Sequence, residues 1–215
     1  MPERILLRGA AGDIEVAAHL PSAASALAVI AHPHPLFGGT MDNKVVTTLE
    51  RAFRERGAGT LRFNFRGVGA SSGTHDEGRG ETADLLTVVE HAARGFGPLP
   101  LWLAGFSFGG AVALRASASV EFARLVLVAP ALRRLTGDGL GEAPDPDDPD
   151  LGAPGRHSHA NTVVVHGDED ETVPLADSFA WARAREVAVV VVPGADHFFH
   201  RKLHILREAV ARWVA

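Results

Sequence analysis

The stretch LWLAGFSFGGAVALRASA, residues Leu101–Ala118, decides the fold. It opens with a short apolar run typical of a buried strand, passes through a glycine-rich turn and continues as a good helix former. The turn has the pattern G-x-S-x-G, with Ser107 between Gly105 and Gly109. Because strands that alternate with helices are the mark of α/β proteins, this stretch points to that class.

The rest of the chain repeats this alternation. Short apolar runs predict five more buried strands, at residues 27–31, 60–65, 125–129, 162–165 and 187–192. Runs of this kind are expected when helices cover both faces of a mostly parallel sheet. Between them, apolar residues recur with helical period from Asp42, around Thr82 and after Phe198. The first segment, from Ile5 to Val16, instead predicts an antiparallel edge hairpin.

A chain of 215 residues can bury one sizeable core, so we expect a single domain over residues 1–215. One stretch breaks the pattern: residues 137–159 contain four prolines with aspartates between them and no apolar periodicity. We expect an irregular, solvent-exposed loop there, too short for a second domain. His157 and His159 lie in this stretch and are expected to be solvated.

Composition narrows the function classes. The formal net charge is -5 and basic residues do not cluster, so a nucleic-acid partner is not expected. The absence of cysteine excludes a cysteine nucleophile and thiolate metal sites. No segment approaches the roughly 18 unbroken apolar residues of a membrane span. Because charged residues also interrupt the first twenty positions, we expect a cytoplasmic protein without a membrane anchor.

Ser107 is the candidate nucleophile. On so sharp a turn the serine backbone is strained and its hydroxyl projects above the sheet, while side chains at Gly105 and Gly109 would collide. The turn also starts a helix, so the N–H of Phe108 would face charge that develops beside Ser107. The pattern alone also fits a glycine-rich packing turn. The residues of the other loops must therefore show whether Ser107 is catalytic or structural.

Two further strands end in polar loops, HGDEDETVP from His166 and PGADHFFH from Pro193. A serine hydroxyl needs a general base, and the base needs a carboxylate to hold its tautomer. His197 is the candidate base. Three acids in the first loop compete for the orienting role: Asp168, Glu169 and Asp170.

Together these loops resemble those of the α/β-hydrolase superfamily, over residues 28–213. The segment HPHPLFGG, residues 32–39, is similar to that of a group of small bacterial serine hydrolases related to the dienelactone-hydrolase and acyl-hydrolase branches. The resemblance implies an α/β-hydrolase fold without a lid domain. It also implies that Asp170 is the acid, because the family's carboxylate lies three residues after the glycine of this loop and shortly before Val-Pro.

In the family, the loop after the strand at residues 27–31 gives a second oxyanion N–H beside that of Phe108. Prolines cannot donate, which leaves His34 or Leu36, and we expect Leu36. The rings of His32 and His34 are expected to pack at the strand end, bonded to loop carbonyls.

The expected function is a serine hydrolase that cleaves a carboxylic ester or similar acyl bond of a small molecule through an acyl-enzyme. Phe37, Phe106 and Phe198 flank the predicted site and are expected to form an apolar wall for the acyl group. A thioesterase or dienelactone-type hydrolase would use the same triad. A non-catalytic binding protein that keeps the fold is the alternative of a different class. A monomer or homodimer is expected.

No cofactor or metal is expected. The stretch LRFNFRGVGASSG from Leu61 has glycines spaced G-x-G-x-x-x-G, one residue off the dinucleotide fingerprint. His200 and His204 have the spacing of metal ligands on a helix, but we expect no carboxylate nearby to complete a site.

Overall fold

The computed structural model describes residues 2–133, 135–136, 139–140 and 157–215. Its main sheet has eight strands: β1 (Glu3–Gly9), β2 (Gly12–His19), β3 (Leu27–Ala31), β4 (Gly59–Phe63), β5 (Leu101–Phe106), β6 (Arg124–Val128), β9 (Thr162–Gly167) and β10 (Ala188–Val192). Their spatial order is β1-β2-β4-β3-β5-β6-β9-β10. Strands β4, β3, β5, β6, β9 and β10 are parallel to one another, whereas β2 runs antiparallel to both β1 and β4. The predicted edge hairpin and mostly parallel sheet are both confirmed.

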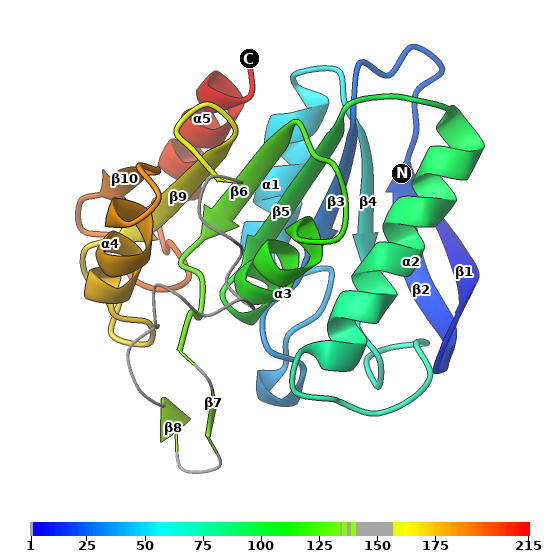
Figure 1. Ribbon diagram of the computed structural model, residues 1–215, viewed down its shortest axis with the longest axis horizontal. Coiled ribbons are helices and arrows are strands. Elements are labelled where there is room, and N and C mark those ends of the chain that lie inside the picture. Colours follow the sequence, from blue (N-terminus) through cyan, green and yellow to red (C-terminus); the bar gives the residue numbers. More distant parts are fainter. Residues whose placement is uncertain (1, 134, 137–138, 141–156) are drawn as a thin grey trace.

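Helices cover both faces of this sheet. They are α1 (Lys44–Arg54), α2 (Arg79–Phe96), α3 (Phe108–Ser117), α4 (Leu175–Arg183) and α5 (Leu203–Trp213). In Figure 1, α2 and α3 lie in front of the sheet and α1 lies behind it. The buried residues accordingly form two cores. One joins the sheet to α2, α3 and α4, and the other joins it to α1 and α5.

Helix α4 is the main element that the sequence did not predict. Its buried face includes the polar residues Asp177 and Ser178 beside Trp181, so the apolar period is weak. Asp177 is satisfied by Arg133, whose Nε lies 2.6 Å from a carboxylate oxygen.

The predicted loop at residues 137–159 is described only in part. Gly139–Leu140 (β8) pairs with Leu135–Thr136 (β7) as a small antiparallel hairpin, while residues 137–138 and 141–156 lie outside the described residues. The expectation of a solvated His157 is wrong: its side chain is buried, with its ring between those of Phe122 and Trp181. His159 is exposed, as expected.

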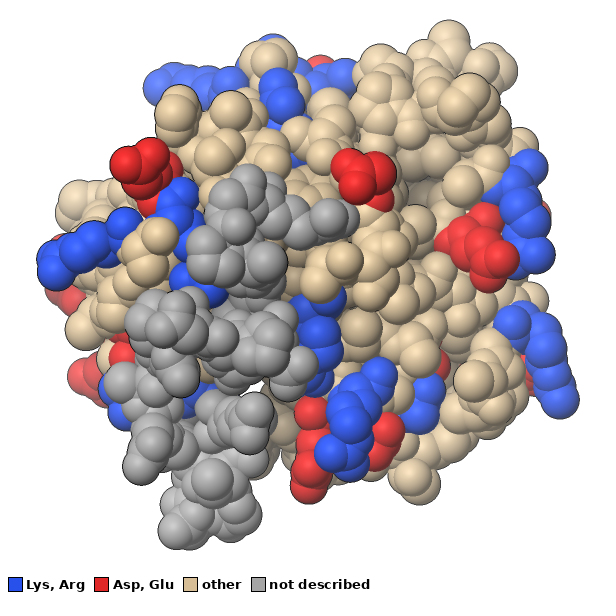
Figure 2. Space-filling view, in the orientation of Figure 1, with Lys and Arg blue, Asp and Glu red and all other residues tan. Residues whose placement is uncertain are grey.

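The parallel register brings the functional loops to one edge of the sheet. Phe106, the last residue of β5, is level with Val128 of β6, which is level with Val165 of β9. Because the carboxyl ends of these strands meet at the same edge, the loops that follow them lie side by side. Figure 2 shows acidic and basic side chains interspersed over the face it presents. Within the described residues, no helix is long and apolar enough to cross a membrane.

Candidate active site

Ser107 lies at the centre of this edge, on the turn between β5 and α3. Its backbone has a φ of 55° and a ψ of -120°, a region that non-glycine residues rarely adopt. A Cβ at Gly105 would collide with the carbonyl of Gly109, and a Cβ at Gly109 with the carbonyl oxygens of Ala31 and His32. The predicted strained turn and its need for both glycines are confirmed.

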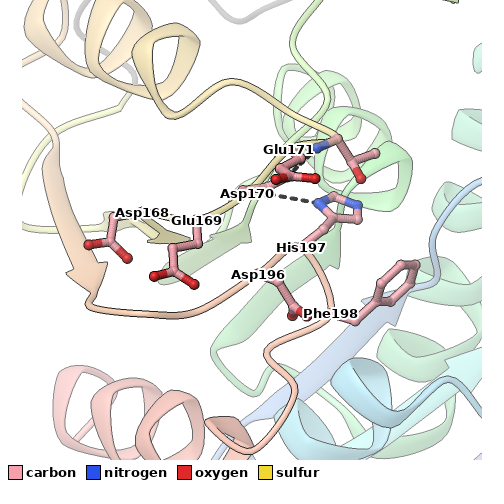
Figure 3. A pocket seen from close by; sticks show the side chains of 8 residues that line it. Asp168, Glu169, Asp170, Glu171, Asp196, His197 and Phe198 are labelled. Atoms are coloured by element: carbon pink, nitrogen blue, oxygen red, sulfur yellow. Dashed lines mark hydrogen bonds and ion pairs between the residues drawn. The ribbon is translucent and has the colours of Figure 1, made fainter.

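Ser107, His197 and Asp170 form a continuous chain of hydrogen bonds. The Oγ of Ser107 is 3.0 Å from Nε2 of His197, and Nδ1 of His197 is 2.7 Å from Oδ2 of Asp170. An ionised carboxylate only accepts hydrogen bonds, so Nδ1 carries the proton and Nε2 accepts from the serine hydroxyl. Figure 3 shows the bond between Asp170 and His197.

The geometry also separates the three acids that the sequence left in competition. Asp168 accepts a hydrogen bond from the N–H of Gly194 at 2.6 Å, and Glu169 is exposed. Asp170 alone of the three is bonded to His197, and its side chain is fully buried.

The carboxylate of Asp170 is held on both of its oxygens. Oδ1 accepts from the N–H groups of Thr172 at 2.9 Å and Val173 at 2.8 Å, and Oδ2 lies 3.1 Å from Nε2 of His166. Burial alone would raise the pKa of Asp170, but hydrogen bonds from His166, His197 and Val173 outweigh it and hold that pKa well below its ordinary value. The carboxylate therefore stays ionised at neutral pH and can stabilise a positive charge on His197.

Two phenylalanines pack on the ring of His197. The Phe106 ring lies 4.8 Å away, centre to centre, and has no exposed surface. It supports the imidazole from within the core and cannot contact a bound substrate, which corrects its prediction as a substrate residue. Phe198 packs edge-on at 5.1 Å and is 44% exposed. Phe37 is 82% exposed, on the short 3-10 helix η1 (Pro35–Phe37).

The loop after β3 lies beside the start of α3, as expected for a second oxyanion donor. The ring of His34 is 4.7 Å from that of Phe108. The N–H of Leu36, the predicted donor, is already bonded to Nδ1 of His34 at 3.2 Å. Among the described residues, the backbone N–H groups of Phe108 and His34 have no acceptor. This geometry favours His34, the other residue that the sequence left open.

His32 has a structural role, as predicted. Its Nδ1 donates to the carbonyl of Pro33 at 2.6 Å, and its Nε2 accepts from the N–H of Phe65 at 3.0 Å. Burial lowers the pKa of His32 to about 4, so the ring is neutral at physiological pH.

An open hollow of about 630 Å³ adjoins His197 on the side of the acidic loop (Figure 3). Its wall is mostly carboxylate and consists of Asp168, Glu169, Asp170, Glu171, Thr172, Asp196, His197 and Phe198. Asp196 lies 2.7 Å from Nδ1 of His200, although the sequence led us to expect no carboxylate near this histidine. Across the described part of the chain, no three potential ligands are grouped so that they could hold a metal ion.

Comparisons with known proteins agree with the fold. Residues 28–138 match the family described as "Serine aminopeptidase, S33". The chain is 38% identical to an α/β serine hydrolase homologue from Coxiella burnetii, with a TM-score of 0.84 over 99% of this chain and 97% of that one. It is 36% identical to a lidless α/β serine hydrolase from Xanthomonas campestris, with a TM-score of 0.84 over 99% and 93%. It is also 29% identical to an uncharacterised protein of Rickettsia prowazekii (strain Madrid E), over 98% of this chain and 87% of that one.

Proposed function

Since the chain belongs to the α/β-hydrolase superfamily of serine hydrolases, we propose that it cleaves carboxylic esters or similar acyl bonds through Ser107, His197 and Asp170. The observation that carries the proposal is the unbroken hydrogen-bond chain from Ser107 Oγ through the ring of His197 to the buried carboxylate of Asp170. A strained serine aligned with a histidine and an ionised acid is the arrangement of an activated nucleophile, which favours an enzyme over a non-catalytic binding protein that keeps the fold.

In the proposed reaction, Ser107 Oγ attacks the acyl carbonyl while Nε2 of His197 takes the hydroxyl proton. The imidazolium that results is stabilised by Asp170 and gives its proton to the departing alcohol. Water then attacks the acyl-enzyme with His197 again acting as base. The product acid leaves and Ser107 is restored.

Two backbone N–H groups would stabilise the negative oxygen formed in each step. We assign them to Phe108 and His34, whose N–H groups have no acceptor among the described residues and whose rings are in contact. Phe108 begins α3, so the positive end of the helix dipole adds to its effect. Preorganised donors of this kind typically contribute roughly 100- to 1,000-fold in rate.

The apolar surface beside the site supports a small acyl group as substrate. Phe37 and Phe198 are the exposed rings that flank it, on η1 and next to His197. Thioesters would be attacked by the same groups, so substrate screens should include them.

Aminopeptidase activity is a second candidate, favoured by the acidic hollow as well as by the description of the matching family. Asp168, Glu169, Glu171 and Asp196 would attract the positively charged amino terminus of a peptide. Within the described residues, no separate domain covers the site and limits its substrates to short peptides. This favours esters over peptides as substrates.

Both candidates are tested by turnover of p-nitrophenyl esters of acetate, butyrate and octanoate, compared with alanine p-nitroanilide. We expect hydrolysis of at least one ester by the wild type and loss of that activity in Ser107→Ala. Cleavage of the anilide alone would favour the peptidase. Equal ester hydrolysis by the wild type and the Ser107→Ala variant would refute the assignment of the nucleophile.

A further inference from the structure

A second histidine, His166, contacts the carboxylate that holds His197. It lies near the end of β9, and its side chain is fully buried. Its Nε2 is 3.1 Å from both Oδ2 of Asp170 and the carbonyl oxygen of Val173, and its Nδ1 is 2.8 Å from Oγ of Ser178 on α4. None of the reaction steps above uses this ring.

The neighbours of His166 fix where its proton lies. Both groups that face Nε2 are acceptors, a backbone carbonyl and an ionised carboxylate, so Nε2 must carry a proton and donate it. Nδ1 is then free to accept from the hydroxyl of Ser178, which selects this tautomer from the other side of the ring.

We propose that His166 is a positioning residue for the reaction, acting through Asp170. Ser178 orients the ring of His166. Asp170 is then oriented by His166 together with the N–H groups of Thr172 and Val173. Asp170 in turn orients His197. The inference rests on the proposed function, because it assigns His166 a role in supporting the same serine.

The inference has an electrostatic consequence. His166 and His197 share the same oxygen, Oδ2, so the bond from His166 withdraws part of the negative charge that His197 experiences. Without His166 the carboxylate would stabilise a protonated His197 more strongly, and a higher pH would be needed to free Nε2 as the base. The other charged groups that line the hollow beside His197, Asp168, Glu169, Glu171 and Asp196, are unchanged by this substitution.

Three variants separate positioning from simple packing. His166→Leu removes the donor, His166→Gln keeps an N–H able to reach Asp170, and Ser178→Ala removes only the hydroxyl that is bonded to Nδ1 and orients the ring. The matched control is His157→Leu. His157 is also a buried histidine, but its ring lies between Phe122 and Trp181.

We expect His166→Leu to lower kcat/KM for the best ester by roughly 10- to 100-fold, the effect of losing one hydrogen bond to a charged group. The acidic limb of its pH–rate profile should move to higher pH. His166→Gln should retain most of the rate and the wild-type limb, and Ser178→Ala should fall between. If the limb of His166→Leu coincides with that of the wild type, or moves no further than that of His157→Leu, the ring is only packing and the inference is wrong.

A readout that needs no activity keeps the inference distinct from the proposed function. In ¹⁵N-histidine-labelled wild type at pH 8, His166 should be the Nε2–H tautomer, and it should remain so in Ser178→Ala, because Asp170 and Val173 still present acceptors to Nε2. An Nδ1–H tautomer in the wild type would overturn the inference, even if His166→Leu does not fold. Absence of any hydrolysis by a wild type with the expected tautomer would instead count against the proposed function.

Discussion

Asp170 accepts hydrogen bonds from two backbone N–H groups and from His197, and Nε2 of His166 lies 3.1 Å from the same carboxylate. This explains why the sequence could not choose among three neighbouring acids from spacing alone. The choice depends on which carboxylate turns inward, and only the resemblance to a family motif pointed to Asp170. His166 was missed for a similar reason, since its position near the end of a buried strand gave no sign that its ring contacts the acid.

Replacing Asp170 with Asn tests the orienting role. Because Oδ1 accepts from two backbone N–H groups, Asn would keep its oxygen there and turn its uncharged amide nitrogen towards His197. That nitrogen donates to Nδ1, so the favoured tautomer of the ring reverses. We expect kcat for the best ester to fall by roughly 10⁴-fold, as in other Ser-His-Asp sites. Glu169→Gln is the matched control, because Glu169 lies in the same loop and is exposed; its kcat should stay within about twofold of the wild type. A large loss in Glu169→Gln with little in Asp170→Asn would reverse the assignment.

The second oxyanion donor can be tested by removing one backbone N–H. His34 has a φ of -54°, which proline adopts, so His34→Pro removes the N–H with little strain. His34→Ala loses the same ring but keeps the N–H, and both variants lose the contact to Leu36. We expect kcat of His34→Pro to be roughly 100- to 1,000-fold below that of His34→Ala. Equal rates for the two would return the role to Leu36, for which Leu36→Pro gives the complementary measurement.

At the scale of elements, the sequence predicted the strands well because their apolar runs are nearly continuous. β3, for example, is entirely buried and has the predicted bounds, Leu27–Ala31. Helix α4 was missed because part of its buried face is polar. Ser178 binds His166, and Asp177 binds Arg133. The apolar period that indicates a helix in the sequence is weakened where the buried face of the helix carries polar residues that support the site.

The packing of α3 against the loop after β3 gives a test of the turn that carries Ser107. A Cβ at Gly109 would collide with the backbone carbonyls of Ala31 and His32, so Gly109→Ala should destabilise the fold by about 1–3 kcal/mol and reduce activity. Gly95→Ala in α2 is the matched control. Nothing lies within 4 Å of a Cβ there, and the substitution should stabilise the helix by up to about 1 kcal/mol. Urea unfolding measures both, and equal effects would contradict the packing argument.

For the whole molecule, two cores on either side of one sheet hold the site at the edge where β5, β6, β9 and β10 end. This architecture follows from the alternation of apolar strands and amphipathic helices, so it could be predicted from the sequence. The burial of His157 could not, because it depends on which rings from distant segments close around it. Proline and aspartate nearby made the local composition misleading.

The pH dependence of stability should carry the signature of Asp170. Its pKa is lower in the folded than in the unfolded protein, so its charge stabilises the fold above the ordinary carboxyl pKa of about 4. That stabilisation is lost as the pH falls from there towards the lowered folded value. The difference in unfolding free energy between the wild type and Asp170→Asn should therefore be constant above pH 5 and shrink below about pH 4. A difference that does not change with pH would show that the carboxylate is not preferentially ionised in the fold.

The most direct test of the central claim is intact-mass analysis after exposure to a fluorophosphonate, applied to the wild type and to Ser107→Ala. Only a serine aligned with a working base reacts with such a reagent at an appreciable rate. We expect a single adduct on the wild type and none on the variant. A folded wild type without an adduct, or an adduct that persists in Ser107→Ala, would contradict the assignment of Ser107 as the activated nucleophile.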